Sequence, residues 1–146
     1  MSVSRSQPVT TMTTDQCWAA VSRMALGRLV TVIDDEPDIF PVNYVVQQRT
    51  ILFRTAPGVK LLGVQRNPRV AFEVDDHTVG TGWSVIVRGE AGVVTGDEEV
   101  GWAERAQVLP WTTTAKDRFV RIRPSRIDGR LFTFGPLDAG LAEFPV

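Results

Sequence analysis

Short runs of β-forming residues joined by short polar turns fill most of this chain, and they restrict its possible folds more than any other feature. The expected strands are 28–33, 39–46, 50–55, 70–74, 83–94, 118–122 and 126–134. Most of the connections are too short for the crossovers that parallel strands require. The pattern therefore predicts a mainly β (α+β) fold: a small closed barrel of six or seven antiparallel strands with two or three peripheral helices.

Three segments have helical patterns, at 13–26, at 59–65 and from Thr95 to about Leu109. The first opens with Thr13 and has a glutamine three residues later, which is the capping-box spacing, and Gly27 is expected to end it. Thr95 and Glu98 have the same spacing and are expected to open the last helix. Residues 34–38, 47–49, 75–82 and 110–117 are expected as turns or loops. Gly89 and Gly92 predict a bulge in the long strand.

Length and composition indicate one domain and exclude several functional classes. A chain of 146 residues fits one core, which we place at 13–146 behind a flexible N-terminal arm at 1–12. A formal net charge of −1 argues against a nucleic-acid binder, and one cysteine with one histidine argues against disulfides and a metal site. The N-terminus has no signal-like run, and no apolar stretch approaches the ~20 residues of a membrane span. We expect a cytoplasmic protein.

A possible phosphate site follows the third expected strand. Arg54 and Thr55 end that strand, Pro57 and Gly58 form a turn, and Lys60 begins a helix. Cationic side chains, a hydroxyl and free N–H groups at a helix start suit a phosphate. Adjacent strand residues point to opposite faces, so regular geometry does not allow Arg54 and Thr55 to face one ligand together. The alternative is an ordinary polar strand end with a solvated lysine.

The mostly apolar strand just before this point is suited to lie against a flat ring, and a ring with a phosphate tail suggests a flavin nucleotide. Several residues are candidates to border that ring. Asn43, or main-chain groups near Pro41, would supply hydrogen bonds to the ring edge. Trp83 is a candidate either to stack on a ring or to fill a subunit interface, and Ser84 is a candidate to donate to a ligand. Trp111, in a threonine-rich loop, is a candidate to cap the pocket. For Tyr44 and Trp83, a place in the core is the alternative.

Other chemistries lack their motifs. The chain has no Gly-x-Ser-x-Gly elbow and no Rossmann or P-loop glycine pattern. Cys17 falls on the buried side of the first helix, where thiols are usually inert. His77 beside two aspartates leaves a general base or a haem ligand open, although a solvated histidine is commoner.

The order of these segments resembles the pyridoxamine 5′-phosphate oxidase-like flavin-binding family over roughly residues 13–132. The residues that carry the resemblance are Gly27-Arg28-Leu29, Pro41-Val42-Asn43-Tyr44, Phe53 to Lys60, Val70 to Asp75, Gly82 to Gly89 and Phe119 to Ile122. The resemblance implies a split β-barrel homodimer with FMN between the subunits. It places Pro41, Val42, Asn43 and Tyr44 along the isoalloxazine, Arg54, Thr55 and Lys60 at the phosphate, and Trp83, Ser84 and the partner's Trp111 nearby.

The chain departs from the vitamin B6 oxidases of that family. Residues 41–46 contain no basic side chain, and 128–132 contain no histidine. The chain looks more like the short branch that includes nitroimidazole-reductase-like proteins and deazaflavin (F420) users. We therefore expect an FMN-dependent oxidoreductase that acts on a small molecule other than pyridoxine phosphate. An F420-dependent reductase and a non-catalytic flavin carrier are the alternatives.

Overall fold

The computed structural model describes residues 8–106, 108 and 118–135. Among these residues the chain forms eight strands and three helices. The strands are β1 (Val9–Thr11), β2 (Leu26–Ile33), β3 (Glu36–Asn43), β4 (Val45–Gln47), β5 (Thr50–Thr55), β6 (Arg69–His77), β7 (Thr81–Val93) and β8 (Arg118–Thr133). The helices are α1 (Thr14–Ser22), α2 (Val59–Arg66) and α3 (Asp97–Arg105).

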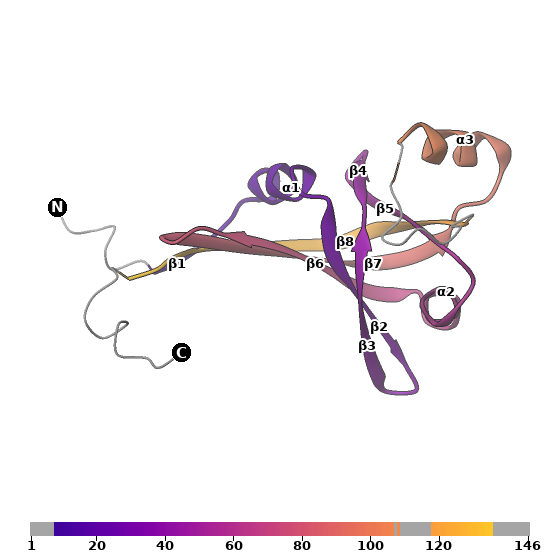
Figure 1. Cartoon of the computed structure of the whole chain (residues 1–146), viewed down its shortest axis with the longest axis horizontal. Helices are drawn as coiled ribbons and strands as arrows, with labels where there is room; N and C mark the ends of the chain where they lie inside the picture. Colours follow the sequence, from indigo (N-terminus) through magenta and orange to yellow (C-terminus); the bar gives the residue numbers. More distant parts are fainter. Residues whose placement is uncertain (1–7, 107, 109–117, 136–146) are drawn as a thin grey trace.

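All eight strands belong to one antiparallel sheet with the order β3-β2-β6-β7-β8-β5-β4, and β1 pairs with β8 beside this path. The two ends of the order, β3 and β4, are consecutive in the chain and are separated only by Tyr44. The sheet must therefore curl until its ends approach each other. Figure 1 shows α1 and α3 on one side of the curled sheet and α2 on the other. The predicted split barrel is confirmed, with eight strands in place of six or seven.

Two tight hairpins set the register of the first strands. Asp34 and Asp35 have φ of 52° and 64°, and Gln48 and Arg49 have φ of 51° and 55°. Paired positive φ values characterise the two-residue turns that match the twist of a hairpin. The hairpin predicted at 47–49 is confirmed, whereas the first turn is shorter than the predicted 34–38 because Glu36 already pairs with Ile33.

The first helix begins as predicted and ends earlier. The Thr13 side chain accepts a hydrogen bond from the Gln16 N–H, and the Gln16 side chain accepts one from the Thr13 N–H, which completes the capping box. The helix stops at Ser22, and Gly27 lies within β2. A Cβ at Gly27 would lie 2.5 Å from the Phe72 ring. Gly27 therefore permits close packing of β2 on β6 and does not end a helix.

The third helix begins differently from the prediction. Its N-cap is Gly96, with φ 88°, and no side chain caps it, so the capping box expected at Thr95 is absent. In contrast, α2 spans the predicted segment with one additional residue and ends before Asn67 as expected.

The strands predicted at 118–122 and 126–134 form one continuous strand, β8. Arg88 pairs with Arg126 while Gly89 pairs with Pro124, so Ser125 is an extra residue in the ladder. A single extra residue reverses which side chains face inward. Val120 and Ile122 face the core before the bulge, and Ile127 faces it afterwards. The register is irregular at Gly89 as expected, but the extra residue lies in β8 and not in the long strand β7.

Two further boundaries differ from the prediction. β6 continues to His77, which pairs with Gly82, so the connecting loop is shorter than the expected 75–82. Residues 9–11, within the expected N-terminal arm, pair with β8 as strand β1. Residues 1–7 lie outside the described part.

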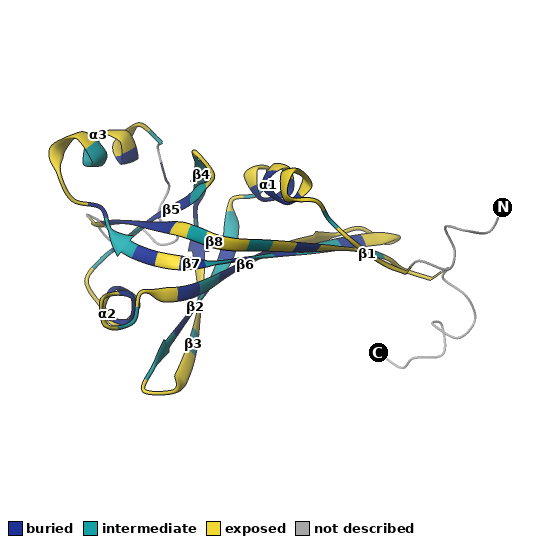
Figure 2. Ribbon diagram, turned by 180° about the vertical axis from the view of Figure 1, so that it is seen from behind, coloured by how far each residue is buried: buried dark blue, intermediate teal, exposed yellow. Residues whose placement is uncertain are grey.

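The main core joins buried residues of the strands with residues of α1 and α2, and Figure 2 marks the buried positions in dark blue. Its fully buried members include Leu29, Phe53, Phe72, Val85 and Ile122, one from each of five strands. A second, smaller cluster packs α3 on the other face of β5 and β8 through Leu52, Ala103 and Phe119. One face of β5 is therefore covered by the main core, and the other face is covered by α3.

Candidate functional site

The start of α2 has features that favour an anion. β5 ends at Thr55, three residues follow, and α2 begins at Val59. Its N-cap is Gly58, without a side-chain hydrogen bond, and its first turn has no acidic residue. The first turns of α1 and α3 both contain acidic residues. The first N–H groups of α2 therefore have neither an intrahelical acceptor nor a neighbouring carboxylate in that turn.

Lys60 connects this helix start to β3. Its ammonium lies 5.8 Å from the centroid of the Phe40 ring, within the range of a cation–π contact. Phe40 immediately precedes the strand segment that was predicted to border a flavin ring. The structure therefore brings the predicted phosphate ligand Lys60 next to the predicted ring-binding strand.

The side chains of Arg54 and Thr55 point to opposite faces of β5. The Arg54 guanidinium carbon lies 5.2 Å from the centroid of the Phe119 ring, on the face of β5 covered by α3. Thr55 is 2% exposed, and its hydroxyl donates to the Ala56 carbonyl at 3.1 Å. The limit expected from strand geometry therefore holds: the Arg54 and Thr55 side chains do not face one ligand together.

Residues 41–44 divide between two faces of the sheet. Val42 and Tyr44 are each 2% exposed and belong to the core, whereas Pro41 is exposed and Asn43 is half-buried. The Tyr44 hydroxyl donates to the Val21 carbonyl at 2.6 Å, and its ring packs edge-on against Phe72 at 5.0 Å. Burial raises the pKa of the Tyr44 hydroxyl. The side chains left to meet a ligand are those of Pro41 and Asn43.

Trp83 and Ser84 also point to opposite faces. Trp83 is half-buried and packs against the main core. Ser84 lies on the outer face, opposite Asp75, and lines a cavity with Ile86 and Arg88. Trp111 lies outside the described residues.

The outer face of β2, β3, β6 and β7 combines apolar and charged side chains. Val30, Ile39, Ala71 and Ile86 line a cavity of about 350 Å³ there, together with Arg28, Glu73 and Arg88. Ile39 is 65% exposed.

Arg28 organises the charged part of this face. It pairs with Glu73 at 2.6 Å and with Asp75 at 2.7 Å. Burial raises the pKa of Glu73, and the hydrogen bond with Glu73 lowers the pKa of Asp75. This pairing leaves Ile39 and its apolar neighbours as the uncovered part of the face.

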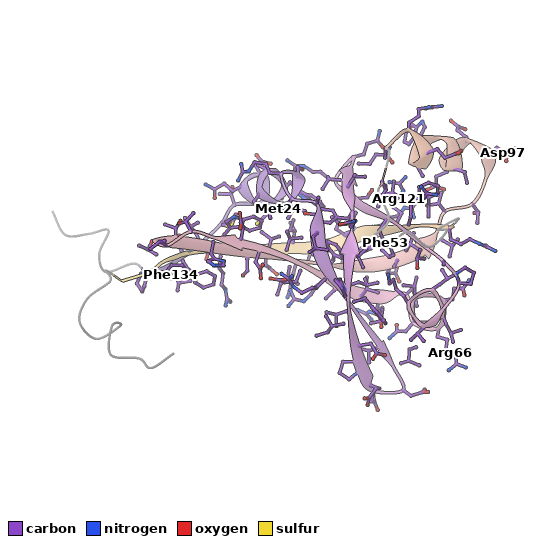
Figure 3. The ribbon with its side chains drawn as sticks, viewed as in Figure 1. Met24, Phe53, Arg66, Asp97, Arg121 and Phe134 are labelled. Carbon is purple, nitrogen blue, oxygen red and sulfur yellow. The ribbon has the colours of Figure 1, made fainter. Side chains whose placement is uncertain are left out.

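Another cavity, of about 520 Å³, lies between α3, the β4–β5 hairpin and β8. It was not predicted, because its residues are far apart in the sequence and belong to no motif. Figure 3 shows Arg121 and Asp97 on the α3 side of the sheet, and Arg66 on the side of α2. The cavity is therefore separate from the start of α2.

The remaining candidates do not form a centre. Cys17 is buried, and burial, with a smaller contribution from Asp128, raises the pKa of its thiol. His77 is exposed at the end of β6. Within the described ranges, no group of three or more His, Cys, Asp or Glu is placed to hold a metal ion. No helix in the same part of the chain is long and apolar enough to cross a membrane.

Comparisons with known proteins agree with this fold. Residues 13–131 match the family described as pyridoxamine 5′-phosphate oxidase. An uncharacterized protein of Mycobacterium tuberculosis strain H37Rv is 56% identical over 92 residues, which cover 63% of this chain and 84% of that protein.

Two solved structures are similar over most of their length. An FAD binding protein of Mycobacterium smegmatis is 46% identical with a TM-score of 0.76, covering 86% of this chain and 99% of that chain. A Corynebacterium glutamicum protein assigned provisionally as a pyridoxamine 5′-phosphate oxidase is 39% identical with a TM-score of 0.82, covering 89% and 97%.

Proposed function

Because the chain belongs to the pyridoxamine 5′-phosphate oxidase-like flavin-binding family, we propose that it is an FMN-dependent oxidoreductase acting on a small molecule. Pyridoxine phosphate is a poor candidate for that molecule. The segment 41–46 has no basic residue, and 128–132 has no histidine, whereas the vitamin B6 oxidases carry both features.

The observation that carries this proposal is the start of α2. An uncapped helix start without acidic residues, with Lys60 beside it, fits the phosphate end of a flavin nucleotide. Lys60 would bind the phosphate with the N–H groups of the first turn. Arg54 would take part only after leaving the Phe119 ring.

The ring would lie along the exposed side of β3. Pro41 and Asn43 lie on the outer face of that strand, and Ser84 lies on the outer face of β7. The Asn43 amide and main-chain groups of 41–43 would orient the ring and hydrogen-bond to its edge. The flavin would supply the hydride chemistry, so the protein needs no acid–base pair of its own for that step.

We also propose that a second copy of the chain covers the outer face and encloses the flavin. Ile39 is 65% exposed within an apolar patch, and such patches commonly mark interfaces. A homodimer of this kind would exclude water from both sites.

FAD is the second candidate cofactor, because the M. smegmatis protein that is 46% identical is an FAD binding protein. FAD contains the same ring and phosphate as FMN, extended by an adenosine monophosphate. F420 and a non-catalytic flavin carrier remain alternatives that the same measurements separate.

The test is a titration of the purified protein with FMN, FAD, F420 and riboflavin, followed by flavin absorbance and fluorescence. We expect Lys60→Gln to weaken FMN about ten- to hundredfold through loss of a charge-assisted bond, and to leave riboflavin binding unchanged. Arg66→Gln, at the opposite end of α2, is the matched control and should bind FMN like the parent. If no flavin binds the parent, the proposal is wrong. If flavin binds but passes no electrons from a nicotinamide donor to any acceptor, the protein is a carrier.

A further inference from the structure

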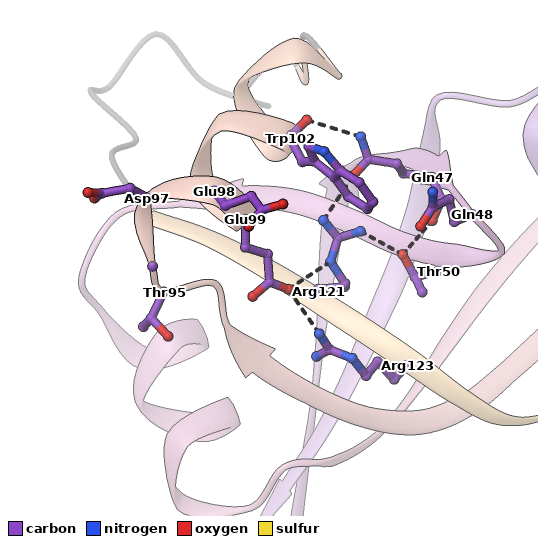
Figure 4. Close-up of a pocket in the computed structure, with 11 residues that line it drawn as sticks. Gln47, Gln48, Thr50, Thr95, Asp97, Glu98, Glu99, Trp102, Arg121 and Arg123 are labelled. Carbon is purple, nitrogen blue, oxygen red and sulfur yellow. Dashed lines mark hydrogen bonds and ion pairs between the residues drawn. The ribbon is translucent and has the colours of Figure 1, made fainter.

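The cavity between α3 and the β4–β5 hairpin has the features of a second ligand-binding site, independent of the proposed flavin function. Its volume of about 520 Å³ lies within the range of small-molecule pockets. The hairpin supplies Gln47 and Thr50, α3 supplies Glu99 and Trp102, and β8 supplies Arg121 (Figure 4).

Arg121 forms the floor of the cavity. The side chain is 6% exposed, and its guanidinium donates from Nη1 to Thr50 Oγ1 at 2.7 Å and from Nη2 to Gln47 Oε1 at 2.8 Å. Nε lies 3.5 Å from Glu99 Oε1. A guanidinium has five N–H donors, and these contacts engage one on each nitrogen, so Nη1 and Nη2 each have a second N–H beyond them. A ligand oxygen or ring nitrogen is the matching acceptor for such a donor.

Glu99 places an acceptor next to these donors. Its Oε1 also pairs with Arg123 at 2.9 Å, whereas its Oε2 has no donor within the described part of the chain. The floor thus presents N–H donors from Arg121 beside a carboxylate oxygen from Glu99. Such a pair matches a ligand edge that carries an acceptor next to an N–H donor.

The charges around the cavity select against ions. Arg121 and Arg123 line the cavity together with the carboxylates of Asp97, Glu98 and Glu99 (Figure 4). An anion would meet the carboxylates of α3, and a cation would meet the two guanidinium groups. A ligand without net charge avoids both penalties.

Trp102 adds a flat apolar wall. It is 40% exposed on α3, and the Gln47 amide fixes its backbone by donating to the Trp102 carbonyl at 3.0 Å. An exposed indole beside hydrogen-bonding groups is suited to stacking against a planar ring.

We propose that this cavity binds a neutral planar N-heterocycle whose edge carries a carbonyl next to an N–H group, as nucleobases and other cyclic amides do. Arg121 donates to the carbonyl, Glu99 accepts from the N–H, and Trp102 stacks on the ring.

Uracil is the first probe, because it carries this edge and no charge. The Trp102 indole N–H resonance is followed in proton–nitrogen spectra of the full chain and is identified by its absence in Trp102→Phe. We expect a saturable shift with uracil. 1,3-Dimethyluracil keeps the ring and both carbonyls but lacks the N–H groups, so it should bind at least about tenfold more weakly.

Variants measured by equilibrium dialysis with labelled uracil test the residue roles. Trp102→Ala should weaken binding at least about fivefold, while Trp102→Phe, which keeps a flat face, should retain most of it. Arg121→Lys should also weaken it at least about fivefold, because the planar fork is lost. The exposed Arg126→Lys on the same strand is the control.

Three results would overturn the proposal. The first is no saturable Trp102 shift up to the solubility limit of uracil. The second is an Arg121→Lys variant that loses thermal stability but binds uracil unchanged, which would make the network purely structural. The third is displacement of uracil by FMN, which would place it in the flavin site. If the protein binds no flavin at all, the uracil titration and its variants still decide the matter.

Discussion

The environment of the Tyr44 side chain in the structure differs from the one that the sequence suggested. It lies in the segment that the family resemblance places along a flavin ring, yet it is 2% exposed and its hydroxyl donates to the Val21 carbonyl. Its neighbour Asn43 keeps the outward position. The alternation of a strand decides which of two adjacent residues meets a ligand.

Tyr44 is the chain's only tyrosine, so tyrosinate absorbance reports on it alone. Burial raises its pKa, so the folded protein should show no tyrosinate at pH about 10, where the denatured chain titrates. Above that pH the unfolded state binds fewer protons, and stability should fall as pH rises. A native protein that titrates near pH 10 would contradict the buried hydroxyl.

Tyr44→Phe provides the matching stability measurement. It should lower the free energy of unfolding by about 1 kcal/mol at neutral pH through loss of the buried hydrogen bond. It should also remove the part of the alkaline decline that belongs to Tyr44. Denaturant unfolding at neutral and alkaline pH measures both effects.

At the scale of the element, the bulge between β7 and β8 allows a specific prediction about stability. A Cβ at Gly89 would collide with the backbone of β8 at the Arg123 carbonyl and Pro124 Cα. Gly89→Ala should therefore cost at least about 2 kcal/mol in denaturant unfolding. Gly92→Ala, three residues along the same strand and with open space around it, should cost less than about 1 kcal/mol. Equal losses would show that the β-strand conformation, and not the close approach, requires glycine.

The elements that sequence reasoning predicted well are those whose signal is local. The turn at Gln48 and Arg49, the Thr13 cap and the span of α2 all depend on neighbouring residues. The errors came from long-range packing. Gly27 resembles a helix stop, but the Phe72 ring determines its role. The extra residue Ser125 breaks the alternation of β8, so one strand looks like two.

The same distinction between local and long-range signals applies to the candidate sites. The start of α2 and Lys60 were recognised from local sequence, and the opposite directions of Arg54 and Thr55 followed from strand geometry. The second cavity was not recognised, because Gln47, Trp102 and Arg121 meet only after three separate elements assemble. A buried arginine also has no distinctive signal in a strand that alternates charged and apolar residues.

For the whole molecule, the proposed dimer makes a clear prediction. Ile39→Asp would place a carboxylate in the apolar patch of the outer face, so sedimentation should give the 16.1 kDa monomer where the parent gives twice that mass. Val79→Asp is the control, since Val79 is 75% exposed at the turn between β6 and β7 and outside the patch. A parent that sediments as a monomer would contradict the proposed interface.

β8 has a consequence for how the chain acquires its fold. It is the last strand in the sequence among the described residues, and it pairs with β1, β5 and β7. Until it is in place, the β4–β5 hairpin has no other strand to join, and an isolated hairpin has little stability. During synthesis the ribosome must therefore release residues 118–133 before the barrel can close. Such long-range pairing folds slowly, and a chain truncated before Arg118 should be retained by chaperones or degraded.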